Sequence, residues 1–306
     1  MKIGIMGSGG VGGYFGARLA DAGNEVSFIA RGAHLEAMAE RGLAVFSPRG
    51  DIRLHPCVCT PDPADVGPVD VVLFATKLYD TESAGRLCAP FIGPDTAVIS
   101  LLNGVESEDV LARILGAEHV VGGVARISAE IESPGVIRHH SDFASIEFGE
   151  MDGRESSRLE RFRDAAREAK IDAEQRNNIR VAIWEKFILL ASLSALTTLT
   201  RLPIGPIRAN SASLELLHEA AREVGAVARA NQVPLPDNAV EKVIHFLDKL
   251  PDHMKASMLL DLERGKRLEL EWLSGTVCRL GRQTAVATPV HCLAYAALSP
   301  FAAGKP

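Results

Sequence analysis

Closely spaced glycines follow the first apolar residues of this 306-residue chain. The run from Ile3 to Met6 leads directly into Gly7-x-Gly9-x-x-Gly12, and an amphipathic segment continues to about Ala22. In such a loop the first glycine permits a tight turn, the second lets the backbone approach a pyrophosphate, and the third lets a helix pack against the strand. The N–H groups at the helix start attract phosphates. The pattern predicts a dinucleotide site made by Gly7, Ser8, Gly9, Gly10, Val11 and Gly12; the alternative is a glycine-rich turn in an ordinary α/β protein.

The residue after the second predicted strand indicates which dinucleotide binds. This strand runs from Glu25 to Ala30, and in an NAD-binding chain an Asp or Glu near its end bonds the ribose hydroxyls. Arg31 stands there instead. A guanidinium suits a 2′-phosphate through paired hydrogen bonds and can stack on adenine. We therefore expect NADP, in the form NADPH, to be preferred; the alternative is that Arg31 is a solvated loop residue.

A lysine interrupts the most apolar helix that the sequence predicts. Lys186 lies within Ile183-Trp-Glu-Lys-Phe-Ile-Leu-Leu190. A lysine in such a helix either extends its ammonium group to solvent or directs it into a polar cleft, where it could give a proton to a reacting oxygen. Its neighbour Glu185 is expected to be exposed.

Two further polar residues follow apolar runs that have the character of buried strands. Lys77 comes after Asp70-Val-Val-Leu-Phe-Ala-Thr76, and Asn103 comes after the run from Thr96 to Leu101. Open α/β sheets bind ligands outside the carboxyl ends of their strands. The amide of Asn103 suits a nicotinamide or a substrate, and the ammonium of Lys77 suits a phosphate, ribose or carboxylate. Taken alone, either residue is also compatible with an ordinary turn.

Strands and helices alternate in the first half of the chain. Residues 43–46 and 52–59 flank a Pro-Arg-Gly-Asp turn and predict a hairpin. Further strands are expected over 120–131, 135–140 and 144–149, and helices over 107–115 and 154–170. Continuous apolar strands are typical of sheets covered on both faces. The alternation predicts a doubly wound, mainly parallel α/β sheet of the Rossmann type.

The periodicity becomes helical near residue 176. Helices are expected over 178–198, 213–231, 238–250, 257–264 and 290–298, with Pro203 and the Gly205-Pro206 pair ending the first of them. The predicted fold is therefore a Rossmann domain that binds NADP, residues 1–175, followed by an all-helical substrate and catalytic domain, residues 176–306. Enzymes of this organisation commonly bind their ligands between the two domains.

Composition narrows the class of protein. The net charge is −6 and no basic face is evident, so no nucleic-acid partner is expected. The five cysteines are odd in number and form no CxxC pair, which favours reduced thiols and a cytoplasmic location. Because the first strand starts at the N-terminus we expect no signal peptide. The longest apolar run, Phe187 to Ala191, is too short to span a membrane.

No metal site is expected. His139 and His140 are adjacent on a predicted strand, so their side chains point to opposite faces, and no third ligand lies at a useful spacing. Cys57 and Cys59 alternate as core residues of a strand would.

The chain resembles the ketopantoate reductase (2-dehydropantoate 2-reductase) family over nearly its whole length. The resemblance rests on the glycine loop, on Ala30-Arg31, on Ala75-Thr-Lys77 and on Leu102-Asn-Gly104. Its most specific parts are Asn177-Asn-Ile-Arg-Val-Ala-Ile-Trp-Glu-Lys186 and Ser257-Met-Leu-Leu-Asp-Leu-Glu-Arg-Gly-Lys-Arg-Leu-Glu269. The resemblance implies NADPH-dependent reduction of a small-molecule 2-oxo acid to a 2-hydroxy acid, the type of step that converts 2-dehydropantoate to pantoate in pantothenate biosynthesis.

The resemblance also implies roles for single residues. Lys186 would be the general acid, since hydride addition to a ketone places charge on the oxygen. Asn103 would orient the nicotinamide or the substrate, and Lys77 would contact the cofactor. Ser257 would hold the substrate carboxylate. Glu269 would bind a hydroxyl of cofactor or substrate and help to orient Lys186.

Three positions depart from the family pattern. Members typically carry asparagines four and eight residues after the lysine and another in the following Asn-Gly turn. Here these positions hold Leu190, Ser194 and Ile204. Lys186, Leu190 and Ser194 would share one helix face, so the resemblance implies a substrate pocket in which Ser194 keeps a polar group and the other two do not.

Several alternatives remain at this level. One is a reductase with the same mechanism and a less polar or bulkier 2-oxo acid. Another is an NADP(H)-binding sensor without turnover, although a sensor would not need the proton donor Lys186. The apolar helices of the second domain fit either a homodimer face or ordinary core.

Overall fold

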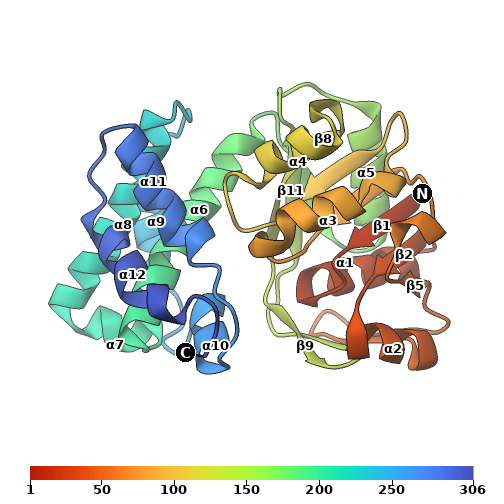
Figure 1. The fold of residues 1–306 in the computed structure, drawn as a ribbon, viewed down its shortest axis with the longest axis horizontal. Coiled ribbons are helices and arrows are strands. Elements are labelled where there is room, and N and C mark those ends of the chain that lie inside the picture. Colours follow the sequence, from red (N-terminus) through yellow and green to blue (C-terminus); the bar gives the residue numbers. More distant parts are fainter. Residues whose placement is uncertain (306) are drawn as a thin grey trace. The chain divides into compact units, whose positions relative to one another are not determined.

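The chain divides into two compact units in the computed structural model, which describes residues 1–305 (Figure 1). The first, called the sheet unit below, comprises residues 1–102 and 106–179. The second, called the helical unit, comprises residues 103–105 and the chain from residue 180 onward. The short segment Asn103–Val105 thus belongs by its contacts to the second unit, although the sheet unit surrounds it in sequence.

The sheet unit contains an eight-stranded sheet in the order β12-β11-β8-β7-β6-β1-β2-β5. Its strands are β1 (Lys2–Met6), β2 (Glu25–Ile29), β5 (Cys59–Thr60), β6 (Val71–Phe74), β7 (Ala97–Ser100), β8 (Val120–Arg126), β11 (Ser145–Glu150) and β12 (Asp172–Gln175). Neighbouring strands are parallel except β8 and β11. The mainly parallel α/β sheet that the sequence predicts is confirmed.

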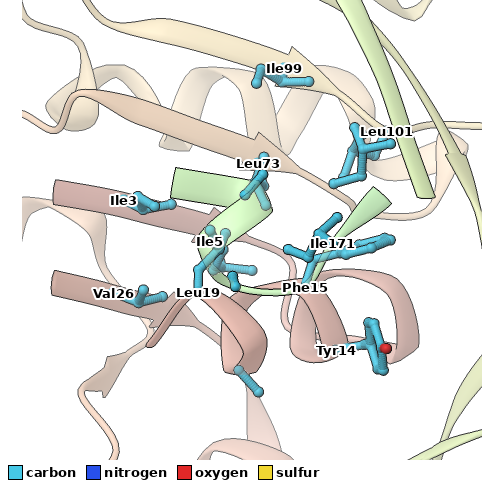
Figure 2. Close-up of a cluster of buried hydrophobic side chains, with 14 of the residues drawn as sticks. Ile3, Ile5, Tyr14, Phe15, Leu19, Val26, Leu73, Ile99, Leu101 and Ile171 are labelled. Carbon is cyan, nitrogen blue, oxygen red and sulfur yellow. The ribbon is translucent and has the colours of Figure 1, made fainter. Parts of the chain in front are cut away.

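Apolar residues on both faces explain why the central strands form. Every residue of β6 and β7 is buried, as helices on both faces of a parallel sheet require. The helices of this unit are α1 (Gly10–Asp21), α2 (Gly32–Arg41), α3 (Thr81–Leu87), α4 (Ser107–Leu115) and α5 (Ser157–Glu168). Figure 2 shows part of the core, where Ile3 and Ile5 of β1 cluster with Phe15 and Leu19 of α1. This packing fixes the start of α1 against the end of β1.

A second, four-stranded sheet lies in the same unit, in the order β4-β3-β10-β9. Its strands are β3 (Leu43–Phe46), β4 (Ile52–Leu54), β9 (Ala129–Ser133) and β10 (Val136–His139). The predicted hairpin at 43–59 is confirmed only in its first part, because β4 ends at Leu54 and Cys59–Thr60 joins β2 in the large sheet. The single strand expected over 120–131 is also wrong, since β8 and β9 belong to different sheets.

The helical unit is built from α6 (Ile179–Thr200), α7 (Ile204–Ala209), α8 (Ser211–Ala230), α9 (Ala239–Leu247), α10 (Ser257–Glu263), α11 (Thr276–Gln283) and α12 (Pro289–Leu298). A π-helical turn, Glu271–Gly275, precedes α11. The long helix α6 ends where Arg201 adopts a positive φ of 58°. Pro206 does not prevent the short helix α7, because it lies in the first turn, where a missing N–H costs little. A helical C-terminal region is confirmed.

Candidate active site

The glycine loop follows β1 and has the backbone geometry that its sequence predicts. Gly7 has a φ of +97°, and a Cβ there would lie 2.9 Å from the Ala75 carbonyl oxygen. A Cβ on Gly12 would lie 2.2 Å from the Gly7 carbonyl oxygen. By contrast, a Cβ on Gly9 would meet nothing within 4 Å. The loop is therefore closed against the protein at Gly7 and Gly12 and open at Gly9, which fits a pyrophosphate approaching the backbone there.

The loop also lies at the position in the sheet where ligands bind. β1 pairs with β2 on one side and β6 on the other, so the chain reverses its direction of travel across the sheet at β1. The loop leads into α1, whose first turn contains no acidic residue. The first N–H groups of a helix lack partners within the helix and carry partial positive charge. The start of this twelve-residue helix can thus hold an anion.

Ser8 is turned into the protein rather than toward a ligand. Its N–H and its Oγ both donate to the carbonyl oxygen of Ile29, over 3.1 and 2.9 Å, and the residue is buried. Both hydrogen-bond donors of Ser8 that could contact a cofactor are thus engaged with Ile29. The hydroxyl instead ties the loop to the end of β2.

His34, which the sequence analysis did not single out, also contacts this loop. Its Nε2 lies 2.9 Å from the Ser8 carbonyl oxygen, and its Nδ1 accepts the Gly135 N–H at 3.0 Å. Because Nδ1 is an acceptor, Nε2 must carry the proton and donate to Ser8. Burial lowers the pKa of His34, although the bond to Ser8 opposes this. No feature of the sequence indicated that His34 lies in the first turn of a helix, since α2 was not predicted.

Arg31 lies where the sequence places it, directly after β2. The side chain is 73% exposed and its Nη2 lies 3.3 Å from a carboxylate oxygen of Asp80. An exposed ion pair of this kind is weak, so Arg31 can exchange Asp80 for a phosphate at little cost. No acidic residue occupies the last position of β2, which is Ile29.

Lys77 follows β6, the other neighbour of β1. It is half-buried, and its carbonyl oxygen accepts the N–H of Asp80 in a short 3-10 turn, Leu78–Asp80. The structure thus brings the glycine loop, Arg31 and Lys77 to the carboxyl ends of three adjacent strands. The sheet unit can offer one continuous edge to a dinucleotide.

The remaining predicted residues belong to the helical unit. Lys186 is half-buried on α6 between the buried residues Trp184 and Phe187, whose rings meet edge to face at 5.7 Å. Leu190 and Ser194 follow at four-residue intervals, and Ser194 is only 3% exposed. Lys186 therefore places an ammonium group on a largely apolar stretch of α6.

Ser257 and Glu269 have different surroundings. Ser257 is the exposed first residue of α10. Glu269 is only 5% exposed, and its carbonyl oxygen accepts the N–H groups of Trp272 and Leu273 at the start of the π-helical turn. Asn103, half-buried, precedes Val105, which packs against the core of this unit. Ser257, Glu269 and Asn103 thus share one unit with Lys186.

Two of the three departing positions are buried, since Ser194 is 3% exposed and Ile204 is 0% exposed. Ile204 is fully buried in the core of the helical unit. Leu190, in contrast, is partly exposed on the face of α6 that carries Lys186. The change at 190 therefore alters an accessible surface, whereas the change at 204 alters packing.

His139 and His140 have the opposite orientations that strand geometry requires. His139 is buried, with Nδ1 2.8 Å from Ser47 Oγ and Nε2 2.9 Å from Ser141 Oγ. His140 lies 3.3 Å from the Glu130 carboxylate on the exposed side. Within residues 1–305, no cluster of three His, Cys, Asp or Glu side chains could hold a metal ion. In the same residues, no helix has the length and apolar character to cross a membrane.

The family of the chain follows from comparison with known sequences. Residues 3–153 match the family described as Ketopantoate reductase PanE/ApbA, and residues 178–302 match its C-terminal part. The chain belongs to the ketopantoate reductase family. This oxidoreductase family accounts for both units, and the sequence resemblance is confirmed.

Relatives within the ketopantoate reductase family carry different names. The chain is 31% identical over 305 residues to "Uncharacterized oxidoreductase YkpB" of Bacillus subtilis, with 100% of each chain covered. It is 32% identical to the 2-dehydropantoate 2-reductase of Archaeoglobus fulgidus, covering 95% of this chain and 94% of that one. Family membership thus leaves the substrate open.

Solved structures of ketopantoate reductases have the same fold. The family member from Ralstonia eutropha JMP134 superposes with a TM-score of 0.90 at 32% identity, covering 98% of both chains. A D-mandelate dehydrogenase bound to NADH and anilino(oxo)acetate gives a TM-score of 0.89 at 24% identity and 98% coverage of both chains. At that identity the second likeness shows the fold alone.

Proposed function

We propose that the chain is an NADPH-dependent reductase that converts a 2-oxo acid to a 2-hydroxy acid, as 2-dehydropantoate 2-reductases do. The observation that carries the proposal is the edge formed by the glycine loop and Arg31. The loop is open at Gly9, where a pyrophosphate would approach, and Arg31 replaces the acid that would favour NAD. The residues present therefore fit NADP.

The sheet unit would hold the cofactor. The N–H groups at the start of α1 would face the pyrophosphate, Arg31 would pair with the 2′-phosphate, and Lys77 would bind phosphate or ribose oxygens. Bound NADPH would supply the hydride that adds to C2 of the oxo acid. When Arg31 binds the phosphate, its ion pair with Asp80 would break and the Asp80 carboxylate would be solvated.

The helical unit would supply the proton and hold the substrate. Lys186 would donate from Nζ to the carbonyl oxygen, which becomes the hydroxyl of the product. A donor in a largely apolar setting stabilises developing oxyanion charge more strongly than one in water. Asn103 would orient the nicotinamide or the substrate through its side-chain amide. Ser257 would bond the substrate carboxylate. Glu269 would bond a hydroxyl of the cofactor or substrate and keep Lys186 oriented.

The substrate itself is 2-dehydropantoate or a less polar 2-oxo acid. Leu190 favours the second, because this accessible position on the Lys186 face has no group to bond a distal hydroxyl. The shared name of many relatives favours the first. Ser194 would be the polar group left on this face of α6.

A labelled cofactor tests the reaction directly. The enzyme is incubated with NADPH deuterated at C4 of the nicotinamide, in both stereoisomers, together with 2-dehydropantoate or 2-oxo-3,3-dimethylbutanoate. We expect one stereoisomer to place deuterium at C2 of the 2-hydroxy acid, as read by mass spectrometry. Absence of any labelled 2-hydroxy acid with either substrate would contradict the proposal.

A further inference from the structure

We propose that His34 is a positioning residue for the cofactor: it aims the Gly9 N–H of the glycine loop at the pyrophosphate of NADPH. The inference rests on the proposed cofactor and concerns a residue that would act through the Ser8–Gly9 peptide. It follows from three hydrogen bonds that hold the single residue Ser8.

The peptide group between Ser8 and Gly9 sets the direction of the Gly9 N–H. The Ser8 carbonyl and the Gly9 N–H belong to the same planar trans peptide, so they point in opposite directions. His34 Nε2 holds the Ser8 carbonyl oxygen at 2.9 Å. The Gly9 N–H must then point away from His34. Gly9 is the residue of the loop that faces open space.

Hydrogen bonds on two sides hold Ser8 in place. Its N–H and Oγ donate to Ile29, so the residue is fixed on one side by the end of β2. Its carbonyl oxygen accepts the proton of His34 Nε2, and Ser8 as a whole is only 4% exposed. A buried carbonyl without a donor is costly. His34 supplies the donor, and without it the peptide could rotate and take the Gly9 N–H with it.

His34 is itself held by the turn between β9 and β10. Its Nδ1 accepts the N–H of Gly135 at 3.0 Å, in the turn between β9 and β10. That turn packs on α2, because a Cβ on Gly135 would lie 3.1 Å from the Cβ of Ala37. The Gly135 bond forces the proton onto Nε2, which is the atom that faces Ser8. The small sheet thus sets the tautomer that the glycine loop needs.

Two substitutions separate the bonds of His34. The amide nitrogen of a glutamine reaches about as far as Nε2, so His34→Gln keeps a donor for Ser8. The amide oxygen of an asparagine lies near Nδ1, so His34→Asn keeps an acceptor for Gly135 and leaves Ser8 without a donor. His34→Ala removes both bonds. His119→Ala is the matched control, because His119 also bonds a backbone carbonyl, Thr96, at 3.1 Å, but at the amino end of β7.

The experiment measures the Kd of NADPH by fluorescence titration, together with the KM for NADPH and kcat at saturating cofactor. We expect His34→Ala and His34→Asn to raise Kd and KM about fivefold or more, with kcat within about twofold. His34→Gln and His119→Ala should stay near the native values. A native Kd in His34→Asn, or rescue by asparagine and not by glutamine, would overturn the inference and assign His34 to holding the β9–β10 turn.

Melting temperatures of all variants are recorded alongside. If His34→Ala does not fold, the glutamine and asparagine variants alone decide, since both preserve most of the side-chain volume. A native protein that binds no NADPH would defeat the proposed function instead, so the two failures are distinguishable.

Discussion

At the scale of single residues, we expect Arg31 to set the preference for NADPH over NADH. A charge-assisted bond to phosphate contributes about 1.5–3 kcal/mol, so Arg31→Ala should lower kcat/KM with NADPH tenfold or more and leave NADH nearly unchanged. Steady-state rates with both cofactors measure this. Arg86→Ala is the control, because Arg86 is similarly exposed and paired with a single carboxylate, that of Glu82. Equal losses with NADPH and NADH would show that Arg31 does not bind the 2′-phosphate.

Lys186 is the residue on which turnover should depend. General acid catalysis contributes about 10²–10⁴-fold, so Lys186→Ala should lose most of kcat and still bind NADPH. Rates and a binding titration check both statements. Lys242→Ala, an exposed lysine on α9, is the control. If Lys186→Ala keeps the native kcat, another group delivers the proton.

Candidate functional residues could be singled out from the sequence more easily than the residues that position them. Gly7 and Gly12 can be identified because the glycine-loop motif requires them. Arg31 and Lys186 can be identified because a basic residue is unexpected at each position: Arg31 stands where an acid would bind NAD, and Lys186 lies within an apolar helix. His34 gives no such sign. Its two partners lie 26 residues before it and 101 residues after it, so only the folded chain reveals the network.

At the scale of elements, the continuous apolar strands were predicted most closely. β6 and β7 are continuous apolar runs, and the structure has them within a residue or two of the predicted bounds. β12 and α2 were missed because their sequences are short or mostly polar. The breaks at 55–58 and 127–128 were missed because pairing with a distant strand, rather than local pattern, assigns each half to its sheet.

The packing of α12 on α8 makes a testable contribution to stability. His291 of α12 is fully buried, with Nδ1 3.2 Å from Ser274 Oγ and Nε2 3.2 Å from the Ala220 carbonyl oxygen. Burial lowers the pKa of His291 to about 4 from its ordinary 6.5. The folded protein therefore holds a neutral imidazole that the unfolded chain would protonate near pH 6.5. The stability it contributes is present above that pH and is lost as the pH falls toward about 4.

The expected loss is about 3 kcal/mol between pH 6.5 and 4, measured by urea unfolding at a series of pH values. His291→Gln should be less stable at pH 7 and should show a smaller loss over this range. His253→Gln, at an exposed position, should keep the native profile. A native-like slope in His291→Gln would place the acid sensitivity elsewhere.

At the scale of the whole molecule, we expect the proposed reductase to differ from 2-dehydropantoate 2-reductases in its substrate preference. Because Leu190 offers no hydrogen bond, the enzyme should not demand the distal hydroxyl of 2-dehydropantoate. We expect kcat/KM for 2-oxo-3,3-dimethylbutanoate, which lacks that hydroxyl, to equal or exceed the value for 2-dehydropantoate. Asparagine at positions 190 and 194 together should move the ratio toward 2-dehydropantoate. A strong native preference for 2-dehydropantoate would mean that other groups bind the hydroxyl.

The proposed function is the NADPH-dependent reduction of a 2-oxo acid. Its most direct test is cofactor oxidation by the native protein across a panel of 2-oxo acids, followed at 340 nm with NADPH and with NADH. We expect turnover of at least one 2-oxo acid, with kcat/KM at least about tenfold higher for NADPH than for NADH. No turnover of any 2-oxo acid, or equal use of the two cofactors, would contradict it.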